Sequence, residues 1–477
     1  MHRLSANTTD QLPATVEHFG YDRTRLRHGI LHLGVGAFHR AHQAVYTDTA
    51  IALSGGDWGI VGASLRSDSV ARQLNPQDGL YTVRSEDANG QQLRLIGALQ
   101  QVLVASQERD RLNALMADPA MRVITLTVTE KGYCLGADGW SLDSEHPDIQ
   151  RDLDNPAAAV SAIGVLAHGL HLRYCHSAAP LTVISCDNLS ENSARLAAAL
   201  RDYLQLSYPE CLSWLTEAVT FPCSMVDRIV PAPGAGVLEE QARLLGLRDE
   251  AAVVTEGFSQ WIIENRFATD VPDWAGAGAL LVGDIRPYES LKLGLLNASH
   301  SAIAYLGLLL DKTSVADVVA DPPLRDYLQR LMARDLIPAL RAPAGFDLPD
   351  YADQLLQRFA NPGLHHRCSQ IAMDATEKIR QRWLPALEAR SGDLLLRALA
   401  AWCSVVLHSD LEIDDPRRDT LLAIRASTDG DTTRLTRLLG TLGIAVSEAP
   451  LWRERLPVLQ RYCADIRAGK LRELLAT

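Results

Sequence analysis

The chain has 477 residues, with 46 Lys and Arg against 58 Asp and Glu and a formal charge of −12 at pH 7. Hydrophobic residues make up 47% and charged residues 22%, an ordinary balance for a globular protein with enough material for two large domains. The acidic balance lacks the basic footprint of a protein that neutralises many phosphates, so we expect neither nucleic acid nor an anionic membrane as a partner.

The first 280 residues alternate short β-branched runs with helical patterns, and the runs lie at residues 29–33, 59–64, 123–128 and 181–185. Strands separated by helices predict a parallel sheet, whose strands are buried on both faces and read as continuous apolar runs. Later segments have the 3.6-residue spacing of helices. These predicted helices lie at residues 291–310, 324–334, 351–359, 370–389 and 393–408, with a proline-rich connection at 337–350. The sequence thus predicts an α/β fold, with a parallel-sheet domain over residues 1–285 and a mainly α-helical domain over residues 286–477.

The eight cysteines include no Cys-x-x-Cys pair, and no histidine cluster has the spacing of a zinc site. The opening residues lack the apolar core of a secretory signal, and the most apolar run, residues 398–407, is about half as long as a membrane-spanning helix needs to be. We therefore expect reduced thiols, no metal and a cytoplasmic location.

A glycine turn follows the first predicted strand, with the sequence Gly34-Val-Gly36-Ala-Phe38-His39-Arg40. In a Rossmann-like dinucleotide-binding domain, the first glycine permits a tight turn, and the second lets main-chain amides approach the pyrophosphate at a helix N-terminus. His39 stands where the usual fingerprint has its third glycine, so the match is partial. An ordinary turn between strand and helix is the alternative.

Asp68 lies just beyond the second predicted strand. A carboxylate there can accept hydrogen bonds from the ribose hydroxyls of the cofactor and would repel a 2′-phosphate, which favours NAD over NADP. Arg66 nearby leaves that preference open, and a solvated loop acid is the alternative for Asp68.

Three polar side chains share one side of the first helix predicted in the second domain. At about 100° per residue, Lys292, Asn297 and His300 fall on the same side, where burial without a purpose is costly. Because desolvation lowers the pKa of lysine, Lys292 could take the proton of an alcohol while hydride leaves its carbon. Asn297 could then donate to the developing alkoxide, and His300 could orient a hydroxyl. A solvated helix face is the alternative.

Other polar residues follow predicted strands. Asn188 comes shortly after residues 181–185, Glu130 comes after residues 123–128, and Asp227 precedes Arg228 in an apolar segment. Ligands bind beyond strand carboxyl ends in such sheets. Asp227 and Arg228 could instead form an internal ion pair.

These pieces together resemble the polyol-specific long-chain dehydrogenases, which include mannitol 2-dehydrogenases, arabinitol 4-dehydrogenases and fructuronate reductases. The resemblance covers nearly the whole chain, and it is carried by residues 32–43, 185–188, 225–229 and 260–264 and by the spacing Lys292-x4-Asn297-x2-His300. It implies a metal-independent, NAD-linked oxidoreductase in which Lys292 is the general acid/base. It also implies that Asn188 and Asn297 stabilise the reacting oxygen, that His300 and Asp227 contact substrate hydroxyls, that Lys378 lines the pocket and that Glu130 gates proton exchange.

The branch of the family is indicated by residues 365–374, which resemble fructuronate reductases, whereas mannitol 2-dehydrogenases tend to carry arginine where Gln370 stands. The carboxylate of a sugar acid needs a cation in a buried pocket, and the candidates are Arg367, Lys378 and protonated His366. Arg367 could instead cap or pair on the helix surface.

We therefore hypothesise NAD-linked interconversion of D-mannonate and D-fructuronate, or of a close relative. Oxidation of mannitol or arabinitol is the alternative. A non-catalytic nucleotide sensor is a remote alternative, because it predicts loss of catalytic residues that this chain retains. The oligomeric state does not follow from the sequence.

Overall fold

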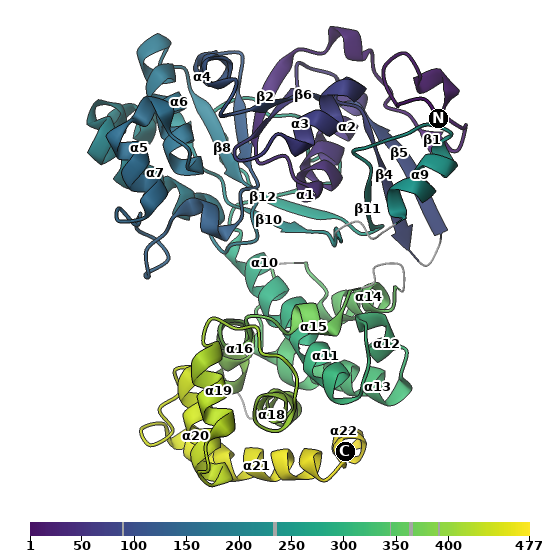
Figure 1. Ribbon diagram of the computed structural model, residues 1–477, viewed down its shortest axis with the longest axis vertical. Coiled ribbons are helices and arrows are strands. Elements are labelled where there is room, and N and C mark those ends of the chain that lie inside the picture. Colours follow the sequence, from purple (N-terminus) through teal and green to yellow (C-terminus); the bar gives the residue numbers. More distant parts are fainter. Residues whose placement is uncertain (88–89, 232–235, 344, 362–365, 390–391) are drawn as a thin grey trace. The chain divides into compact units, whose positions relative to one another are not determined.

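The computed structural model describes residues 1–87, 90–231, 236–343, 345–361, 366–389 and 392–477. The chain divides into two compact units, Met1–Arg286 and Pro287–Thr477 (Figure 1). The first unit combines sheets with helices and the second is mainly helical, as the change in sequence periodicity predicts.

The largest sheet of the first unit has six strands in the described part of the chain, in the order β6-β3-β2-β7-β8-β9. Every neighbouring pair in it runs parallel. The strands are β2 (His28–Leu33), β3 (Gly59–Ser64), β6 (Leu99–Val104), β7 (Val123–Leu126), β8 (Leu181–Ser185) and β9 (Val219–Thr220). The chain adds β3 and β6 on one side of β2 and then crosses to add β7, β8 and β9 on the other. In sheets of this order, ligands bind beyond the carboxyl ends of the strands where the order reverses, which here are β2 and β7.

Helices cover both faces of this sheet (Figure 1). Alternate strand residues enter different cores, so that Leu31 and Val61 face one core while their neighbours Ile30 and Ile60 face the other. The first core contains α4 (Arg109–Ala117), α5 (Pro147–Asp154), α6 (Ala162–His176), α7 (Asn192–Ser207) and α8 (Leu212–Ala218). The second contains α1 (Ala37–Ala41), α2 (Gln43–Ser54) and α3 (Ser69–Leu74). Burial on both faces explains why the strands read as continuous apolar runs.

Two smaller sheets complete the first unit. One has the order β1-β5-β4-β11, and the other has the order β10-β12-β13. Their strands and the accompanying helix are β1 (Val16–Glu17), β4 (Tyr81–Asp87), β5 (Gly90–Ile96), β10 (Ser224–Asp227), β11 (Val253–Glu256), β12 (Gln260–Glu264), β13 (Leu280–Val282) and α9 (Val237–Leu245). The sequence pattern does not predict these sheets.

The second unit is built around α11 and α18, whose residues are buried along most of their length. Its helices are α10 (Arg286–Leu291), the π-helix η7 (Lys292–Asn297), α11 (Ala298–Leu309), α12 (Val315–Val319), α13 (Pro322–Leu331), the π-helix η8 (Met332–Leu336), α14 (Leu348–Phe359), α15 (Cys368–Ile371), α16 (Ala375–Arg382), α17 (Leu384–Ala389), α18 (Asp393–His408), α19 (Arg418–Ala426), α20 (Asp431–Thr441), α21 (Pro450–Arg467) and α22 (Leu471–Ala476). The helices predicted at residues 291–310 and 324–334 are present, and each contains a π-helical turn that departs from the regular 3.6-residue spacing.

The helix predicted at residues 370–389 is wrong, because this segment forms α15, α16 and α17 with breaks between them. Asp374, in the turn between α15 and α16, takes a left-handed conformation with φ 54°, which is incompatible with one continuous helix. The side chain of Asp415, distant in sequence, then accepts hydrogen bonds from the main-chain amide and hydroxyl of Thr376 and starts α16. Pro385 near the start of α17 cannot continue the preceding helix.

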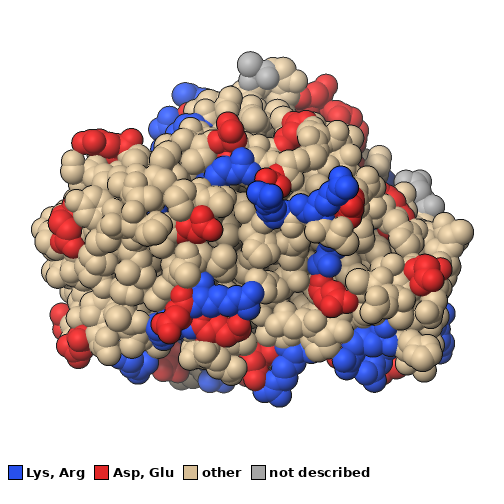
Figure 2. All heavy atoms as spheres, turned by 90° about the horizontal axis from the view of Figure 1, so that it is seen from above, with Lys and Arg blue, Asp and Glu red and all other residues tan. Residues whose placement is uncertain are grey.

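The charged side chains on the face shown in Figure 2 are mixed, with Lys and Arg lying among Asp and Glu. All eight cysteines carry free thiols, and all of them except Cys175 are buried. Among the described helices, none combines the length and the apolar composition required to cross a bilayer.

Candidate active site

The glycine turn lies where the sheet order reverses, at the carboxyl end of β2. Gly34 has φ +93°, and a Cβ there would stand 2.1 Å from the Thr127 carbonyl oxygen, so the position requires glycine. Its own carbonyl oxygen accepts a hydrogen bond from the Thr127 hydroxyl at 2.6 Å, which fixes the turn to the end of β7. The tight turn predicted for Gly34 therefore has a steric cause.

Gly36 is different, because no described part of the chain requires glycine there. It is exposed, it has extended backbone (φ −84°, ψ 179°) at the start of α1, and a built Cβ meets no atom nearer than 4.0 Å. A small residue at an open position beside a helix start fits the close approach of a ligand's phosphates. The turn is therefore compatible with a dinucleotide. Phe38 is partly exposed just beyond it, with its ring 5.0 Å from the His42 ring.

His39 lies in the interface between α1 and β2 rather than on the surface of the turn. Its ring is fully buried and stacks on the ring of His32, with centroids 3.4 Å apart. Burial, together with the charge of His32, lowers the pKa of His39 well below its usual value, so the ring is neutral. The usual third glycine serves close packing of helix on strand, and here two stacked imidazoles occupy that interface. Because His39 has no exposed surface, its side chain supports the turn by packing between α1 and β2.

Arg40 is also buried. Its guanidinium donates to the main-chain oxygens of Ala251 and Gly36, and its own carbonyl accepts a hydrogen bond from the Tyr81 hydroxyl at 2.7 Å. These contacts tie α1 to neighbouring segments of the first unit.

Asp68 lies beyond the carboxyl end of β3, at the start of α3, as the prediction requires. Its carboxylate pairs with Arg72 at 2.5 Å, and Arg66 lies 3.7 Å from Asp148. A ribose hydroxyl would share the Asp68 carboxylate with Arg72.

Asp187, beyond β8, organises the segment that follows β7. Its carboxylate accepts hydrogen bonds from the amides of Val128 and Thr129 at 3.0 and 2.8 Å and from the Tyr133 hydroxyl at 2.7 Å. Burial raises the pKa of Asp187, while these three donors act in the opposite direction. Thr129 has φ +67°, a strained conformation that such contacts hold in place.

Two predicted site residues are adjacent to this carboxylate in sequence. Asn188 follows Asp187 directly and Glu130 follows Thr129, and both are exposed. Asp187 therefore orders the backbone next to each of these exposed residues. The sequence alone did not indicate that Asp187 connects the two strand ends.

Asp227 is the last residue of β10 and is 6% exposed. The guanidinium of Arg228 donates to the main-chain oxygens of Ala41 and Glu256, and burial lowers its pKa to about 10. Arg228 thus connects the main chain at the end of α1 to the main chain at the end of β11.

Lys292 and Asn297 are the first and last residues of the π-helix η7 in the second unit, and both side chains are partly buried. The angles computed for a regular α-helix therefore do not apply between them. π-helical turns are rare overall, but those that occur are often found at functional sites, because they reorient side chains relative to the rest of a helix. Tyr288, which precedes this segment, packs edge-on against Phe346.

Two side chains from the end of α16 hold the junction between η7 and α11. Arg382 donates to the carbonyl oxygen of Asn297 at 3.3 Å and to the Ser301 hydroxyl at 3.0 Å, and the Trp383 indole donates to the carbonyl oxygen of Ala298 at 2.9 Å. These contacts fix the backbone that carries Asn297. Nothing in the sequence near Asn297 signals Arg382, because the contact spans 85 residues.

His300 is 7% exposed on α11, with its ring 4.4 Å from Phe359 and 5.4 Å from His366. Burial, and then the charges of His366, Arg358 and Arg382, lower the pKa of His300 well below its usual value. His300 Nε2 and His366 Nδ1 are buried and have no hydrogen-bond partner within the described residues. Such atoms are costly unless something polar reaches them, which fits a hydroxylated ligand.

Lys378 lies near this pair, since its charge, after burial, lowers the pKa of His366. Both effects disfavour a protonated His366. The Lys378 ammonium donates to the Ile371 carbonyl oxygen at 3.2 Å and lies 4.0 Å from the Asp374 carboxylate. Arg367 and Gln370 are exposed, and His365 lies outside the described residues.

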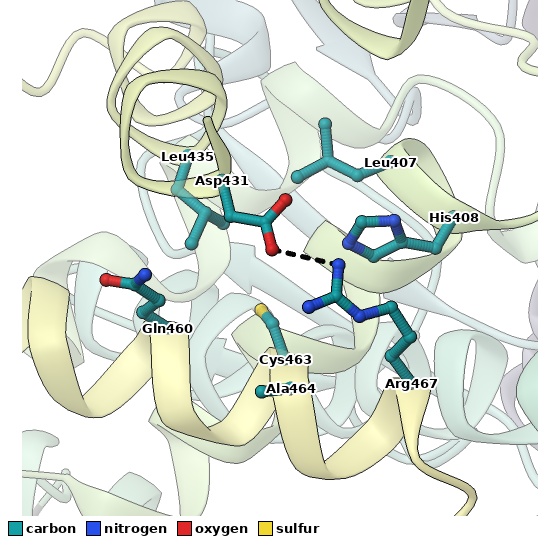
Figure 3. Close-up of a pocket in the computed structure, with 8 residues that line it drawn as sticks. All are labelled: Leu407, His408, Asp431, Leu435, Gln460, Cys463, Ala464 and Arg467. Atoms are coloured by element: carbon teal, nitrogen blue, oxygen red, sulfur yellow. Dashed lines mark ion pairs between the residues drawn. The ribbon is translucent and has the colours of Figure 1, made fainter. Parts of the chain in front are cut away.

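A pocket elsewhere in the second unit, between α18, α20 and α21, is not large enough for a sugar (Figure 3). Its volume is about 10 Å³, room for one water molecule. The Asp431 carboxylate and the Arg467 guanidinium pair across it at 2.8 Å.

Comparison with known proteins covers both units. A family described as the mannitol dehydrogenase Rossmann domain matches residues 28–276, and one described as the mannitol dehydrogenase C-terminal domain matches residues 284–439. The D-mannonate oxidoreductase of Escherichia coli K12 is 40% identical over 445 residues, which are 90% of this chain and 91% of that protein. A mannitol 2-dehydrogenase of Aspergillus fumigatus is 36% identical over 442 residues, 89% of this chain and 88% of that protein.

A solved structure has the same fold. The Pseudomonas fluorescens mannitol 2-dehydrogenase, in a ternary complex with NAD and D-mannitol, is 31% identical to this chain and has a TM-score of 0.85. The match covers 99% of this chain and 98% of that one.

Proposed function

Because the chain belongs to the mannitol dehydrogenase family of oxidoreductases, we propose that it interconverts D-mannonate and D-fructuronate with NAD. The observation that carries the substrate class is the 40% identity to a D-mannonate oxidoreductase over nine-tenths of the chain. The partner is then a small sugar acid, converted between a secondary alcohol and a ketone.

NAD is assigned to the turn after β2. Gly34 shapes the turn, Gly36 leaves open space for the phosphates, and Asp68 accepts hydrogen bonds from the ribose. When bound there, the nicotinamide of NAD would supply the acceptor for the hydride that leaves the carbon being oxidised. His39 and Arg40 contribute from within, by holding α1 against the sheet.

Lys292 is assigned as the general base that takes the hydroxyl proton in oxidation and returns it in reduction. Lys292 is the first residue of the π-helix η7 and is partly buried, and a lysine amine in its neutral form can accept the proton of a hydroxyl group. Asn297, held through its backbone by Arg382, donates a hydrogen bond to the oxygen as its charge develops.

His300 is assigned to a substrate hydroxyl. Its buried Nε2 lacks a partner among the described residues, and a neutral imidazole can donate to or accept from a hydroxyl. From the first unit, Asn188 is assigned to the reacting oxygen, Asp227 to a substrate hydroxyl and Glu130 to proton exchange with solvent. The support for these roles is the family resemblance, together with the order that Asp187 imposes on its neighbours.

A carboxylate distinguishes the sugar acid from a polyol and requires a cation. Lys378 is our candidate, because it lies beside the His366 and His300 pair and its side chain is 24% exposed. Arg367 is the second candidate, on the exposed start of α15.

Oxidation of mannitol or arabinitol is the alternative function, and the similarity to mannitol 2-dehydrogenases favours it. Side-by-side turnover of D-mannonate, D-mannitol and D-arabinitol with NAD and with NADP separates the two. We expect the highest kcat/KM with D-mannonate and NAD. Brisk oxidation of mannitol with none of mannonate would replace this proposal by the alternative.

A further inference from the structure

A cluster of metal-ligating side chains lies in the first unit, on segments that the proposed function does not use. His171 and Cys175 are one turn apart on α6, and Glu210 and Cys211 belong to the short 3-10 turn Pro209–Cys211 after α7. The ligand atoms of His171, Glu210 and Cys211 all lie within 4.8 Å of one another.

The two distances from His171 match those of a tetrahedral zinc site. His171 Nδ1 is 3.5 Å from Cys211 Sγ and 3.3 Å from the Glu210 carboxylate. With Zn–N and Zn–O bonds near 2.1 Å and Zn–S bonds near 2.3 Å, the corresponding tetrahedral edges are about 3.6 and about 3.4 Å. Cys175 Sγ lies 4.0 Å from the same nitrogen and 3.7 Å from Nε2, so it would become a fourth ligand only after its side chain rotates towards the Nδ1 side of the ring.

The surroundings orient the histidine. The Tyr208 ring stacks on the His171 ring with centroids 3.9 Å apart, and the Tyr208 hydroxyl bonds to His168 Nδ1 at 2.7 Å. Stacking on Tyr208, which is itself held by His168, restricts the rotation of the His171 ring. Glu210 and Cys175 are exposed, so an ion has access from solvent, while Cys211 is fully buried.

The cluster lies at the amino ends of the strands of the main sheet, whereas the glycine turn lies at their carboxyl ends. The helix α6 leads from Cys175 into the amino end of β8, and α7 returns from the carboxyl end of β8 to Glu210. A metal there would join α6 to the end of α7 and would take no part in the oxidation.

We propose that His171, Glu210 and Cys211, with Cys175 as a fourth ligand, bind one structural Zn²⁺. The donor set of imidazole, carboxylate and thiol suits Zn²⁺ rather than Mg²⁺ or Ca²⁺, which prefer oxygen. The expectation of no metal rested on the absence of Cys-x-x-Cys pairs and of histidine clusters with zinc spacing, and on the metal-independent chemistry that the family resemblance implies. The signal for this cluster is weaker, a His-x3-Cys pair on one helix and a Glu-Cys pair 35 residues later.

The test is binding of Zn²⁺ to the full chain after treatment with a chelator, by titration calorimetry and by metal analysis after ultrafiltration. We expect about one Zn²⁺ per chain, and affinity at least about tenfold lower in His171→Ala and in Cys211→Ala. Cys403→Ala removes another fully buried thiol, from α18, and keeps wild-type affinity. Glu210→Gln changes only an exposed side chain and also weakens binding, which guards against misfolding of the buried variants.

Co²⁺ provides a second readout, because a thiolate ligand gives a charge-transfer absorption that a site of oxygen and nitrogen lacks. The wild type shows this band with Co²⁺, and Cys211→Ala loses at least half of it. Absence of stoichiometric Zn²⁺ binding, or undiminished affinity in both His171→Ala and Cys211→Ala, overturns the proposal.

Discussion

Replacing Gly36 with alanine tests whether the turn after β2 holds a dinucleotide. The backbone at Gly36, with φ −84° and ψ 179°, is one that alanine adopts without strain, and a Cβ meets no atom within less than 4.0 Å. The substitution also reduces the freedom of the unfolded chain, so the free energy of unfolding should stay level or rise by about 0.4–1 kcal/mol. NAD affinity should fall about tenfold or more, a loss of about 1.4 kcal/mol, because the methyl group occupies the space assigned to the phosphates.

Gly34→Ala, in contrast, should lower the free energy of unfolding. An L residue at φ +93° costs of order 1–3 kcal/mol, and the overlap of its Cβ with the Thr127 carbonyl oxygen adds to this. We expect unfolding to be easier by at least about 3 kcal/mol. The two glycines, two positions apart, thus separate stability from binding.

Gly430→Ala is the matched control, because Gly430 also has extended backbone at a helix start and open space around its Cβ, but on α20 in the second unit. Urea denaturation gives the free energies, and calorimetric titration with NAD gives the affinities. Wild-type NAD affinity in Gly36→Ala, alongside unchanged affinity in Gly430→Ala, would refute the assignment of the turn to the cofactor.

Three further predictions concern the interior and the substrate. Arg382→Ala removes the contacts to Asn297 and Ser301, so kcat should fall about tenfold. Arg382→Lys should recover part of the lost activity. An unchanged kcat in Arg382→Ala would show that the junction between η7 and α11 needs no such support. Burial lowers the pKa of His32 to about 3 and that of His39 well below its usual value, so the folded first unit binds fewer protons than the unfolded chain. The free energy of unfolding should therefore keep its full value above pH 6.5 and fall by about 3 kcal/mol between pH 6.5 and 5, as measured by denaturation curves at each pH. His39→Phe should show about half of that decline. Lys378→Gln should raise KM for mannonate about tenfold or more while leaving mannitol little affected, and the same selectivity in Arg367→Gln instead would move the carboxylate partner to α15.

The strands of the main sheet were predictable because burial on both faces leaves a local signature. Residues 59–64 and 181–185 match β3 and β8, and residues 393–408 match α18, whose sides are nearly all buried. The smaller sheets were not predicted. Strands as short as β10 and β13 are stabilised by their partners more than by any pattern of their own.

The breaks in the second unit depend on contacts that no local window contains. Asp415 starts α16 from 39 residues away, and the junction at Asn297 is held by Arg382. The π-helix between Lys292 and Asn297 likewise leaves no local signal that we can identify. Sequence patterns therefore placed these polar residues on one continuous helical segment, but they did not predict the angles between the side chains around the helix axis.

The candidate site divides in the same way. Lys292, Asn297, His300 and the glycine turn were found from residue types and spacing, because their chemistry is unusual in apolar surroundings. The roles of Asp187 and of the stacked His32 and His39 rings required the fold, since each joins segments that are separate in sequence.

The most direct test of the central claim is the rate of mannonate oxidation by Lys292→Ala, measured as NADH formation beside the wild type, with NAD affinity determined for both. We predict a wild type that turns over mannonate and a variant whose kcat is lower by about 10²-fold or more at unchanged NAD affinity, because a positioned base contributes at least that factor. A variant whose activity stays within about tenfold of the wild type would contradict the assignment of Lys292 as the base.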